Sequence, residues 1–512
     1  MGIFANLWRL ARTGATFQRT GALADALGEV DAPAPVRLAA RVLFAPLGPL
    51  GLKGDPELPP VVRALTALGP AYVKFGQILS TRPDVVGARL AREMRVLQDR
   101  MPAFSQAEAE AAVERELGRP VSELFAEFGP PVAAASIAQV HPARVAETGE
   151  AVAVKVLRPG VEKAFRKDVD AFWFIANLIH VLAPKSRRLR PRAVIRHFES
   201  VVMTELDLRL EASAAAEYRA NSEGDKGVSS PAVHWPLSAR RVMTTEWVDG
   251  TPLGDVEALR ATGIDMEAMG ALVVQTFLRH ALRDGFFHAD MHQGNLKVSP
   301  AGELVTLDFG IMGRIDPYTR RVYAEILLGF LRKDYRRVAE VHFEAGYVPA
   351  DQDLETFAQA LRSIGEPIFG QQADRISMAK LLAHLFDVTE RFGMQTRTEL
   401  ILLQRTMVVV EGVGRTLDPH LNIWTTAKPV VEEWMRDNLG PAQMLRDMKA
   451  TAQVLGRFGP RLPEIAERAL MKLAEPEAPP APARLPAAAL WLALGAGLGG
   501  GVVGALLVAL LD

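Results

Sequence analysis

The sequence predicts an α+β protein with more than one domain, and two observations support this prediction. Residues 132–158 and 296–307 show the short apolar runs and turn signals that are typical of β-strands. Segments with helical periodicity lie between and after them, at 193–220, at 266–284 and over much of 317–474. The length of 512 residues is enough for a large core and for more than one domain.

Composition excludes several classes of function. The 59 basic residues balance the 60 acidic residues, so the chain lacks the excess positive charge of a nucleic-acid-binding protein. It contains no cysteine, which rules out disulfides, thiolate metal sites and cysteine nucleophiles.

The segment 286–310 holds two polar clusters joined by a short hairpin. Together the clusters comprise His288, Asp290, His292, Asn295 and the triplet Asp308-Phe309-Gly310. Two short strands separate them, with a turn at 300–303 that contains proline and glycine. Because the hairpin folds back on itself, we expect Asp290, Asn295 and Asp308 to lie together at one end.

Three side chains of this kind suit phosphoryl transfer, which depends on positioning and on neutralisation of charge by magnesium. Asn and Asp offer the hard oxygen ligands that Mg²⁺ prefers. An Asp followed five positions later by an Asn, and then by Asp-Phe-Gly after a hairpin, follows the order of a protein kinase. Asp290 is therefore the predicted catalytic residue, and Asn295 and Asp308 are the predicted metal ligands.

The alternation of His288, Asp290 and His292 also allows a different interpretation. On a strand, these three side chains would share one face and could bind a transition metal. We favour the other interpretation, in which His288 braces the loop backbone and His292 lies near the phosphates.

Lys155 lies in a strand-like Ala-Val-Ala-Val-Lys-Val run, upstream of the two clusters, where a kinase lysine contacts the α- and β-phosphates of ATP. The loop before it is not glycine-rich: Ala133, Ala134, Ala135 and Ser136 stand where glycines would cradle phosphate. Alanine restricts the approach of the backbone to phosphate. We expect these five residues to contact ATP, although in an unusual way.

The stretch 193–220 is predicted to form one long helix. Glu205 and Glu211 are six positions apart, about 240° around a helix, so they cannot have the same role. One of them could pair with Lys155, while the other, with Asp207, would face elsewhere.

Two further segments carry candidate residues. The strand-like residues 242–248 are placed as an interlobe hinge, where the backbone around Glu246 and Val248 would contact adenine. In the predicted helices of 59–100, Lys74 and Gln77 are three positions apart and share a face.

The two ends of the chain differ in character. Near the N-terminus an amphipathic helix around 7–14 is expected to pack on the protein's own body. Residues 486–511 carry no charge, are long enough for one transmembrane helix, and follow a Pro- and Ala-rich linker at 475–485. Basic residues precede this segment and only Asp512 follows it, so we expect the body in the cytoplasm. Glycines spaced four apart in it would allow a homodimer through the anchor helix.

These motifs resemble the UbiB family of atypical, protein-kinase-like proteins, also called the aarF-domain or ADCK family. The resemblance covers roughly residues 60–420. The segments that carry it are KFGQ at 74–77, AAAS with IAQVH, VAVKVLRPGV, ELDLRLEA, FFHADMHQGN and LDFG. The opening RTGATFQRTGA and the C-terminal anchor look like the proteobacterial members that are linked to ubiquinone biosynthesis.

The resemblance implies a two-lobed kinase-like fold with a helical N-terminal extension, a helical C-terminal region and a transmembrane helix. The implied parts are an extension at 1–120, an N-lobe at 121–250, a C-lobe at 251–420, a helical region at 421–474, the linker and the anchor. It further implies that Lys74 and Gln77 contact Glu205 and Asp207, a regulatory pairing. Glu211 would then pair with Lys155.

In functional terms, the resemblance implies a membrane-anchored ATP-binding kinase or ATPase that uses Mg²⁺ and supports ubiquinone biosynthesis. Its implied location is the bacterial inner membrane. Its implied partners are membrane lipid, ubiquinone precursors and other enzymes of that pathway, and not nucleic acid. Two alternatives stay open: a catalytically silent, nucleotide-switched protein that presents a lipid precursor, and a small-molecule kinase. The chain departs from many relatives at Ala138, Met291 and Gln293, where those relatives have glycine or proline.

Overall fold

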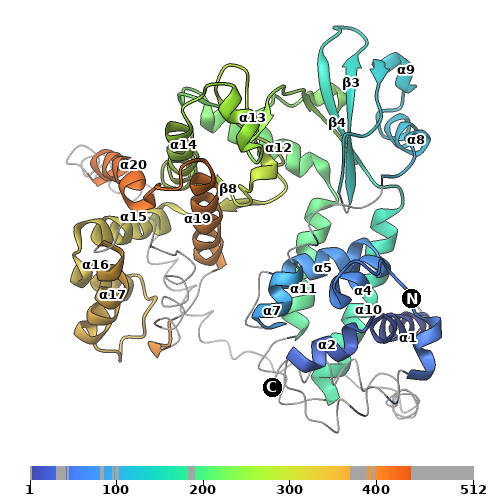
Figure 1. The fold of residues 1–512 in the computed structure, drawn as a ribbon, viewed down its shortest axis with the longest axis horizontal. Coiled ribbons are helices and arrows are strands. Elements are labelled where there is room, and N and C mark those ends of the chain that lie inside the picture. The colour runs from blue at the N-terminus through green and yellow to red at the C-terminus, as the bar shows by residue number, and fades with distance from the viewer. Residues whose placement is uncertain are drawn as a thin grey trace, which may run out of the picture. The chain divides into compact units, whose positions relative to one another are not determined.

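The protein folds as two compact units in the computed structural model (Figure 1). The structure describes residues 3–29, 38, 42, 45–80, 86–94, 97, 103–135, 137–182, 191–369, 388, 391–394 and 398–439. The first unit comprises the described residues up to Leu210 together with Val233–Trp247. The second comprises Glu211–Ala232 and the described residues from Val248 onward. The predicted domain boundaries within these units stay predictions.

An antiparallel sheet forms one part of the first unit. Its strands lie in the order β1 (Phe125–Phe128), β3 (Ala138–Val145), β4 (Ala151–Leu157) and β6 (Val242–Glu246), and β2 (Ala133–Ala134) pairs with β3. One face packs against α8 (Gln106–Leu117) and α9 (Val121–Leu124), beside which β3 and β4 are seen in Figure 1. Three alternate valines of β4, at 152, 154 and 156, are fully buried in that core. The predicted strands of 132–158 are therefore confirmed.

Helices form the rest of the first unit. They are α1 (Ile3–Thr20), α2 (Ala22–Glu29), α4 (Pro60–Leu68), α5 (Pro70–Ser80), α7 (Ala88–Met94), α10 (Val161–Leu182) and α11 (Pro191–Glu205), with a 3₁₀ turn at Ala45–Leu50. The side chain of Thr13 on α1 hydrogen-bonds the Tyr72 hydroxyl at 2.8 Å, and Arg9 pairs with Asp168 on α10. The N-terminal helix thus packs on the body of the protein, as expected.

The prediction of one helix over 193–220 is wrong. The chain leaves helical geometry at Leu206 and Asp207, so α11 ends at Glu205 and a separate helix, α12, runs from Leu208 to Ser222. The Leu208 N–H donates to the backbone oxygen of Arg240 at 2.9 Å, so a tertiary contact takes the place of a helical bond. Asp207 caps the new helix, because its Oδ1 accepts the backbone N–H of Arg209 at 3.2 Å.

The second unit joins small sheets to a helical body. Its sheets have the order β5 (Val228–Ser229), β10 (Leu304–Thr306), β9 (Leu296–Val298), β7 (Thr251–Pro252), and the pair β8 (Phe286–His288) with β11 (Met312–Arg314). The helices are α13 (Val256–Ala261), α14 (Met266–Arg279), α15 (Pro317–Arg332), α16 (Tyr335–Glu344), α17 (Leu354–Phe369), α19 (Thr398–Leu417) and α20 (Ile423–Leu439). The predicted hairpin is confirmed, since Leu304 pairs with Val298 and Thr306 with Leu296.

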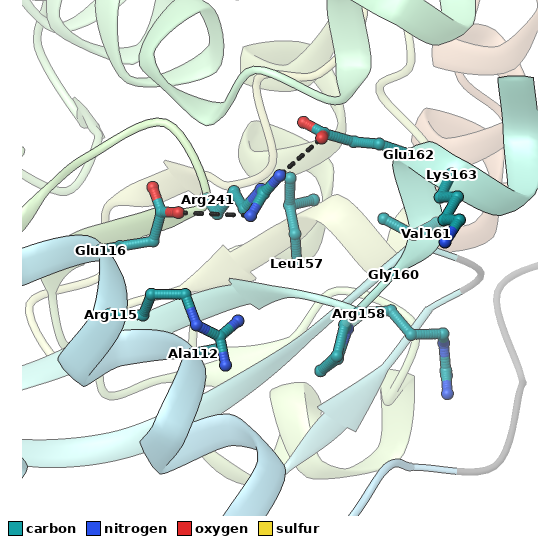
Figure 2. Close-up of a pocket in the computed structure, with 11 residues that line it drawn as sticks. Ala112, Arg115, Glu116, Leu157, Arg158, Gly160, Val161, Glu162, Lys163 and Arg241 are labelled. Atoms are coloured by element: carbon teal, nitrogen blue, oxygen red, sulfur yellow. Dashed lines mark hydrogen bonds and ion pairs between the residues drawn. The ribbon is translucent and has the colours of Figure 1, made fainter.

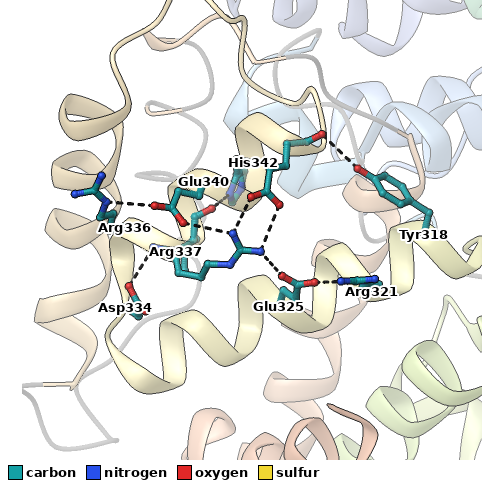
Figure 3. Close-up of polar contacts among 10 residues, drawn as sticks. Tyr318, Arg321, Glu325, Asp334, Arg336, Arg337, Glu340 and His342 are labelled. Atoms are coloured by element: carbon teal, nitrogen blue, oxygen red, sulfur yellow. Dashed lines mark hydrogen bonds and ion pairs between the residues drawn. The ribbon is translucent and has the colours of Figure 1, made fainter. Parts of the chain in front are cut away.

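An arginine network joins α15 to α16, as Figure 3 shows. Arg337 contacts Glu325 on α15 and Glu344 on its own helix, each at 2.8 Å, and also Glu340. The arginine side chain is 40% exposed. Solvent screening makes such pairs weak contributors to stability, so the network mainly fixes how the two helices pack.

The membrane prediction requires a correction. Among the described residues, no helix is both long enough and apolar enough to cross a membrane. The expectation of an inner-membrane protein with one C-terminal span is therefore not retained. The segment 486–511, its linker and the dimer expected through it lie outside the described residues.

We predict a pH dependence of stability from His342 on α16. Burial lowers the pKa of this histidine to about 4, while Nδ1–H donates to the Val338 oxygen at 2.7 Å. Between pH 6.5 and 4 the unfolded chain binds a proton that the folded chain does not, so stability falls as the pH falls. The expected contribution is ~3 kcal/mol over that range.

Melting midpoints between pH 8 and 5 will test this prediction. The variant His342→Phe should show a flatter dependence than the natural chain, and His420→Gln, which removes an exposed histidine, should not. Parallel curves for His342→Phe and the natural chain would contradict it.

Candidate active site

A buried histidine ties together the two polar clusters of the second unit. His288 ends β8 and is 1% exposed. Its Nε2–H donates to the backbone oxygens of Leu307 (3.1 Å) and Asp308 (2.7 Å), and its Nδ1 accepts the N–H of Asp290 (3.1 Å). Burial lowers its pKa, so the ring stays neutral, with one nitrogen that donates and one that accepts. The predicted bracing role of His288 is confirmed.

Asn295 lies in a 3₁₀ turn at the start of the hairpin. Its Nδ2 donates to the backbone oxygen of Asp290 at 3.0 Å, and its own backbone oxygen accepts the N–H of Leu307 at 2.8 Å. With the amide nitrogen engaged by the loop, Oδ1 is the atom that could bind a cation. The hairpin thus brings Asn295, Asp290 and the residues before Asp308 together at one end.

Asp308 adopts a backbone conformation that few side chains accept. Its φ is 56°, in the left-handed region, which Asp and Asn enter more readily than other residues with a Cβ. Its Oδ1 accepts the N–H of Gly310 at 3.2 Å. Backbone strain of this kind is common at functional sites.

This donor set fits magnesium better than a transition metal. Among the described residues, no group of three His, Cys, Asp or Glu side chains is arranged to hold a metal ion. Two oxygen donors, from Asn295 and Asp308, suit an Mg²⁺ ion that takes its other ligands from phosphate and water. Both ring nitrogens of His288 are bound to backbone, which disfavours the transition-metal interpretation. His292 lies near Asp290, with 3.7 Å between Nε2 and Oδ2.

The helix α19 also anchors the loop that carries Asp290. The buried Thr406 donates its hydroxyl to the backbone oxygen of Ala289 at 3.1 Å. Gln293, at a position where the resemblance implies proline in many relatives, donates to the Thr416 hydroxyl at 2.9 Å. The departure at Gln293 therefore adds a side-chain contact that a proline lacks. Neither threonine stood out in the sequence, because each acts through a contact more than 100 residues away.

In the first unit, Lys155 points away from the buried core of the sheet. It lies between the buried Val154 and Val156 on β4, so alternation places it on the opposite face. Across the sheet it pairs with Val140 on β3, and Val140 pairs in turn with Ala133 on β2. Residues directly opposite one another share a face. Lys155 and Ala133 thus belong to one row on one face of the sheet.

The alanine segment is held as part of that sheet. Ala134 pairs with Gln139, and the N–H of Ala135 donates to the backbone oxygen of Ala138 at 2.8 Å. Ser136 lies outside the described residues. Ala133 and Ala134 therefore form a short strand of the sheet, and the contact of the segment with ATP stays a prediction.

The predicted hinge contains the end of β6. Glu246 is the last residue of that strand, and the N–H of Trp247 donates to the backbone oxygen of Ala151 at 3.0 Å. Val248 belongs to the second unit, where its backbone oxygen accepts a hydrogen bond from Lys297 Nζ at 3.2 Å. The predicted adenine contact of this segment stays a prediction.

The structure brings Lys74 and Glu205 together, as the resemblance implies. Lys74 Nζ lies 2.6 Å from Glu205 Oε1, and both side chains are largely buried. Gln77 Nε2 donates to the backbone oxygen of Leu97 at 2.7 Å. The carboxylate of Asp207 is bound by Arg209, at 2.6 Å for the shorter contact, which lowers the pKa of Asp207. A regulatory role for these residues stays a prediction.

Helix α12 carries a residue that the sequence analysis missed. Glu211 lies in its first turn, in the second unit, and its pairing with Lys155 stays a prediction. Tyr218 follows seven positions later, so it lies on the same helix face. Its hydroxyl hydrogen-bonds Thr306 at 3.3 Å and its ring centroid lies 5.2 Å from that of Phe309. The seven-residue spacing from Glu211 was the available signal.

A cavity of about 120 Å³ lies in the first unit between α8, the end of β4 and the first turn of α10 (Figure 2). Arg241 bridges its wall, 2.6 Å from Glu162 and 3.5 Å from Glu116. One arginine directly before β6 thus contacts a carboxylate on α8 and a carboxylate on α10. The cavity wall contains none of the predicted site residues among those that the structure describes.

We predict that His288→Phe frees the two loops without removing a cation ligand. The substitution fills a similar volume but removes three hydrogen bonds, each worth about 1 kcal/mol. Amides of 289–290 and 307–310 should therefore exchange with solvent at least about tenfold faster in hydrogen-exchange measurements. The matched control is His280→Phe, a fully buried histidine of the same unit. Equal acceleration in both variants would contradict the prediction.

Comparison with known proteins now places the chain. Residues 96–342 match the ABC1 atypical kinase-like domain, and residues 361–422 match the UbiB helical domain. The chain is 39% identical over 449 residues to "Probable protein kinase UbiB" of Marinobacter nauticus, which covers 86% of this chain and 81% of that protein. A protein of the same name from Edwardsiella ictaluri is 39% identical over 437 residues, covering 84% and 80%.

A solved structure supports the fold alone. The complex of Rv3197 with erythromycin from Mycobacterium tuberculosis has a TM-score of 0.51 at 24% identity, covering 69% of this chain and 90% of that one. These matches show the kinase-like fold of mixed helix and sheet that the sequence predicts. The chain therefore belongs to the UbiB family of atypical kinase-like proteins.

Proposed function

We propose that this protein is an Mg²⁺-dependent atypical kinase or ATPase that supports ubiquinone biosynthesis. The observation that carries the proposal is the end of the β9–β10 hairpin, where one buried histidine and one amide tie Asp290, Asn295 and Asp308 into a single constellation. This constellation offers one carboxylate for the attacking group and two oxygen donors for a cation. Its acceptor is a small lipid precursor or water rather than a protein.

Each residue of the constellation has a distinct task in this proposal. Asp290 accepts a proton from, or orients, the attacking hydroxyl or water, and its backbone N–H is fixed by His288. Asn295 and Asp308 hold Mg²⁺, which neutralises charge on the β- and γ-phosphates when it is bound. Lys155 holds the α- and β-phosphates.

The strand-like alanine segment supports a second candidate, a nucleotide-switched protein that presents a lipid precursor without turnover. Ala133 and Ala134 are paired with β3, which limits how closely their backbone can approach phosphate. The intact carboxylates of Asp290 and Asp308 oppose it. Tight nucleotide binding without hydrolysis, with and without a phenolic precursor mimic, would favour this candidate.

Hydrolysis of MgATP by the full chain tests the first candidate. Asp290→Asn and Asp308→Asn should each lower turnover at least about 100-fold, because each removes a charge that acts on the transferred group. Asp316→Asn is the matched control: Asp316 caps α15 in the same unit, and asparagine is an equally good cap. Full turnover in both test variants would refute the proposed function.

A further inference from the structure

The motif Ile-Ala-Gln-Val-His contains two buried polar residues that the proposed function does not use. Gln139 is 1% exposed and His141 is fully buried, and both lie on the core face of β3. Their partners across β4 are Val156 and Val154, members of the apolar core. Polar side chains in such a row require hydrogen-bond partners, because an unsatisfied buried group costs stability.

Hydrogen bonds join these two residues into one chain. The Oε1 of Gln139 accepts the N–H of Phe104 at 3.0 Å, and its Nε2 donates to the Phe104 oxygen at 3.3 Å. The same Nε2 donates to Nε2 of His141 at 2.8 Å, so the proton of the neutral ring lies on Nδ1. That Nδ1–H donates to the backbone oxygen of Gly129 at 2.8 Å. Burial lowers the pKa of His141, which favours this neutral form.

The chain of hydrogen bonds ends at Gly129, which precedes the alanine segment, and at Phe104, which precedes α8. Gly129 begins the segment that leads into Ala133, and its N–H donates to the Pro142 oxygen at 2.8 Å. Phe104 precedes α8 and lies seven residues after Leu97. Leu97 is the residue whose oxygen binds Gln77, on the helix that also carries Lys74.

Phe104 also contacts the far end of the alanine segment. The guanidinium of Arg158 lies 5.3 Å from the centre of the Phe104 ring. The backbone N–H of Arg158 donates to the oxygen of Ile137 at 2.7 Å. The alanine segment is therefore tied to Phe104 on both sides, through Gly129 before it and through Ile137 after it.

We propose that Gln139 and His141 are positioning residues that fix the alanine segment to Phe104, and thereby hold it in place before nucleotide binds. This inference rests on the proposed function, since it assigns positioning residues to the same nucleotide site. When the connection is broken, the segment must be ordered at the moment nucleotide binds. The cost of that ordering weakens binding.

A purely structural role makes a different forecast. If the pair only completes the core, its loss lowers stability. Nucleotide affinity then changes no more than it does after any other substitution of a buried polar residue in the sheet. Thr244 on β6 supplies that comparison, because it is fully buried and its hydroxyl donates to the Leu237 oxygen at 2.7 Å. Thr244→Val removes one buried hydrogen bond without contact to Phe104 or Gly129.

The experiment compares the full natural chain with Gln139→Met, His141→Leu and Thr244→Val. Gln139→Met and His141→Leu should raise the Kd for MgATP about threefold to tenfold and speed hydrogen exchange at 129–135. Thr244→Val should lower the melting midpoint but leave the Kd for MgATP and the hydrogen exchange at 129–135 unchanged. His141→Asn, which keeps a donor at the δ position for Gly129, should restore part of both readouts and is the milder variant should His141→Leu fail to fold.

Each outcome has a defined meaning. A Kd that stays level or falls in Gln139→Met, together with exchange no faster than in Thr244→Val, would overturn the inference. If the natural chain binds no MgATP, the proposed function fails instead. In that case hydrogen exchange at 129–135 still decides whether Gln139 and His141 fix the segment.

Discussion

A neutral imidazole shared between two loops is the interaction on which the second unit's polar constellation depends. His288 donates to the chain just before and at Asp308 and accepts from Asp290, so both loops must fit the same ring. A charged ring would lose its acceptor, and burial opposes that charge. The brace lies between β8 and β10, and the hairpin register then places Asn295 beside it.

Similar bonds hold two other segments that run outside regular strands. Thr406 on α19 holds Ala289, and Gln139 holds both backbone groups of Phe104. Buried backbone groups need partners, and at these places no neighbouring strand supplies them. Single polar side chains supply these partners instead. Each such hydrogen bond fixes the loop at one position. This arrangement also connects the helical part matched by the UbiB helical domain directly to the loop of Asp290.

Local signals in the sequence predicted the elements that local chemistry decides. The hairpin of 296–306 followed from its turn residues, and the strands around Lys155 followed from short apolar runs and turn signals. The break at Asp207 could not be seen in this way. Helical periodicity runs through it, and the competing hydrogen bond comes from Arg240, more than 30 residues away.

In the candidate site, too, local sequence signals located some residues, and distant contacts decided others. The positions of Asp290, Asn295 and Asp308 were predictable because one short hairpin carries them. Thr406 was not, since it reaches the site from a distant helix, and for Tyr218 the spacing from Glu211 was the single signal. The anchor expected at the C-terminus rested on the absence of charge in residues that the structure does not describe, and the described helices gave it no support.

The left-handed backbone of Asp308 has a consequence for how this lineage can change. At φ 56° glycine, asparagine and aspartate are accommodated more readily than most residues, although Lys333 adopts φ 59° at the end of α15. In the proposed function the left-handed backbone and the bound cation would both favour aspartate at this position. Descendants that lose this carboxylate would be expected to take Asn or Gly first, because these residues keep the turn with little added strain. An inactive relative would therefore be expected to have Asn or Gly at this position.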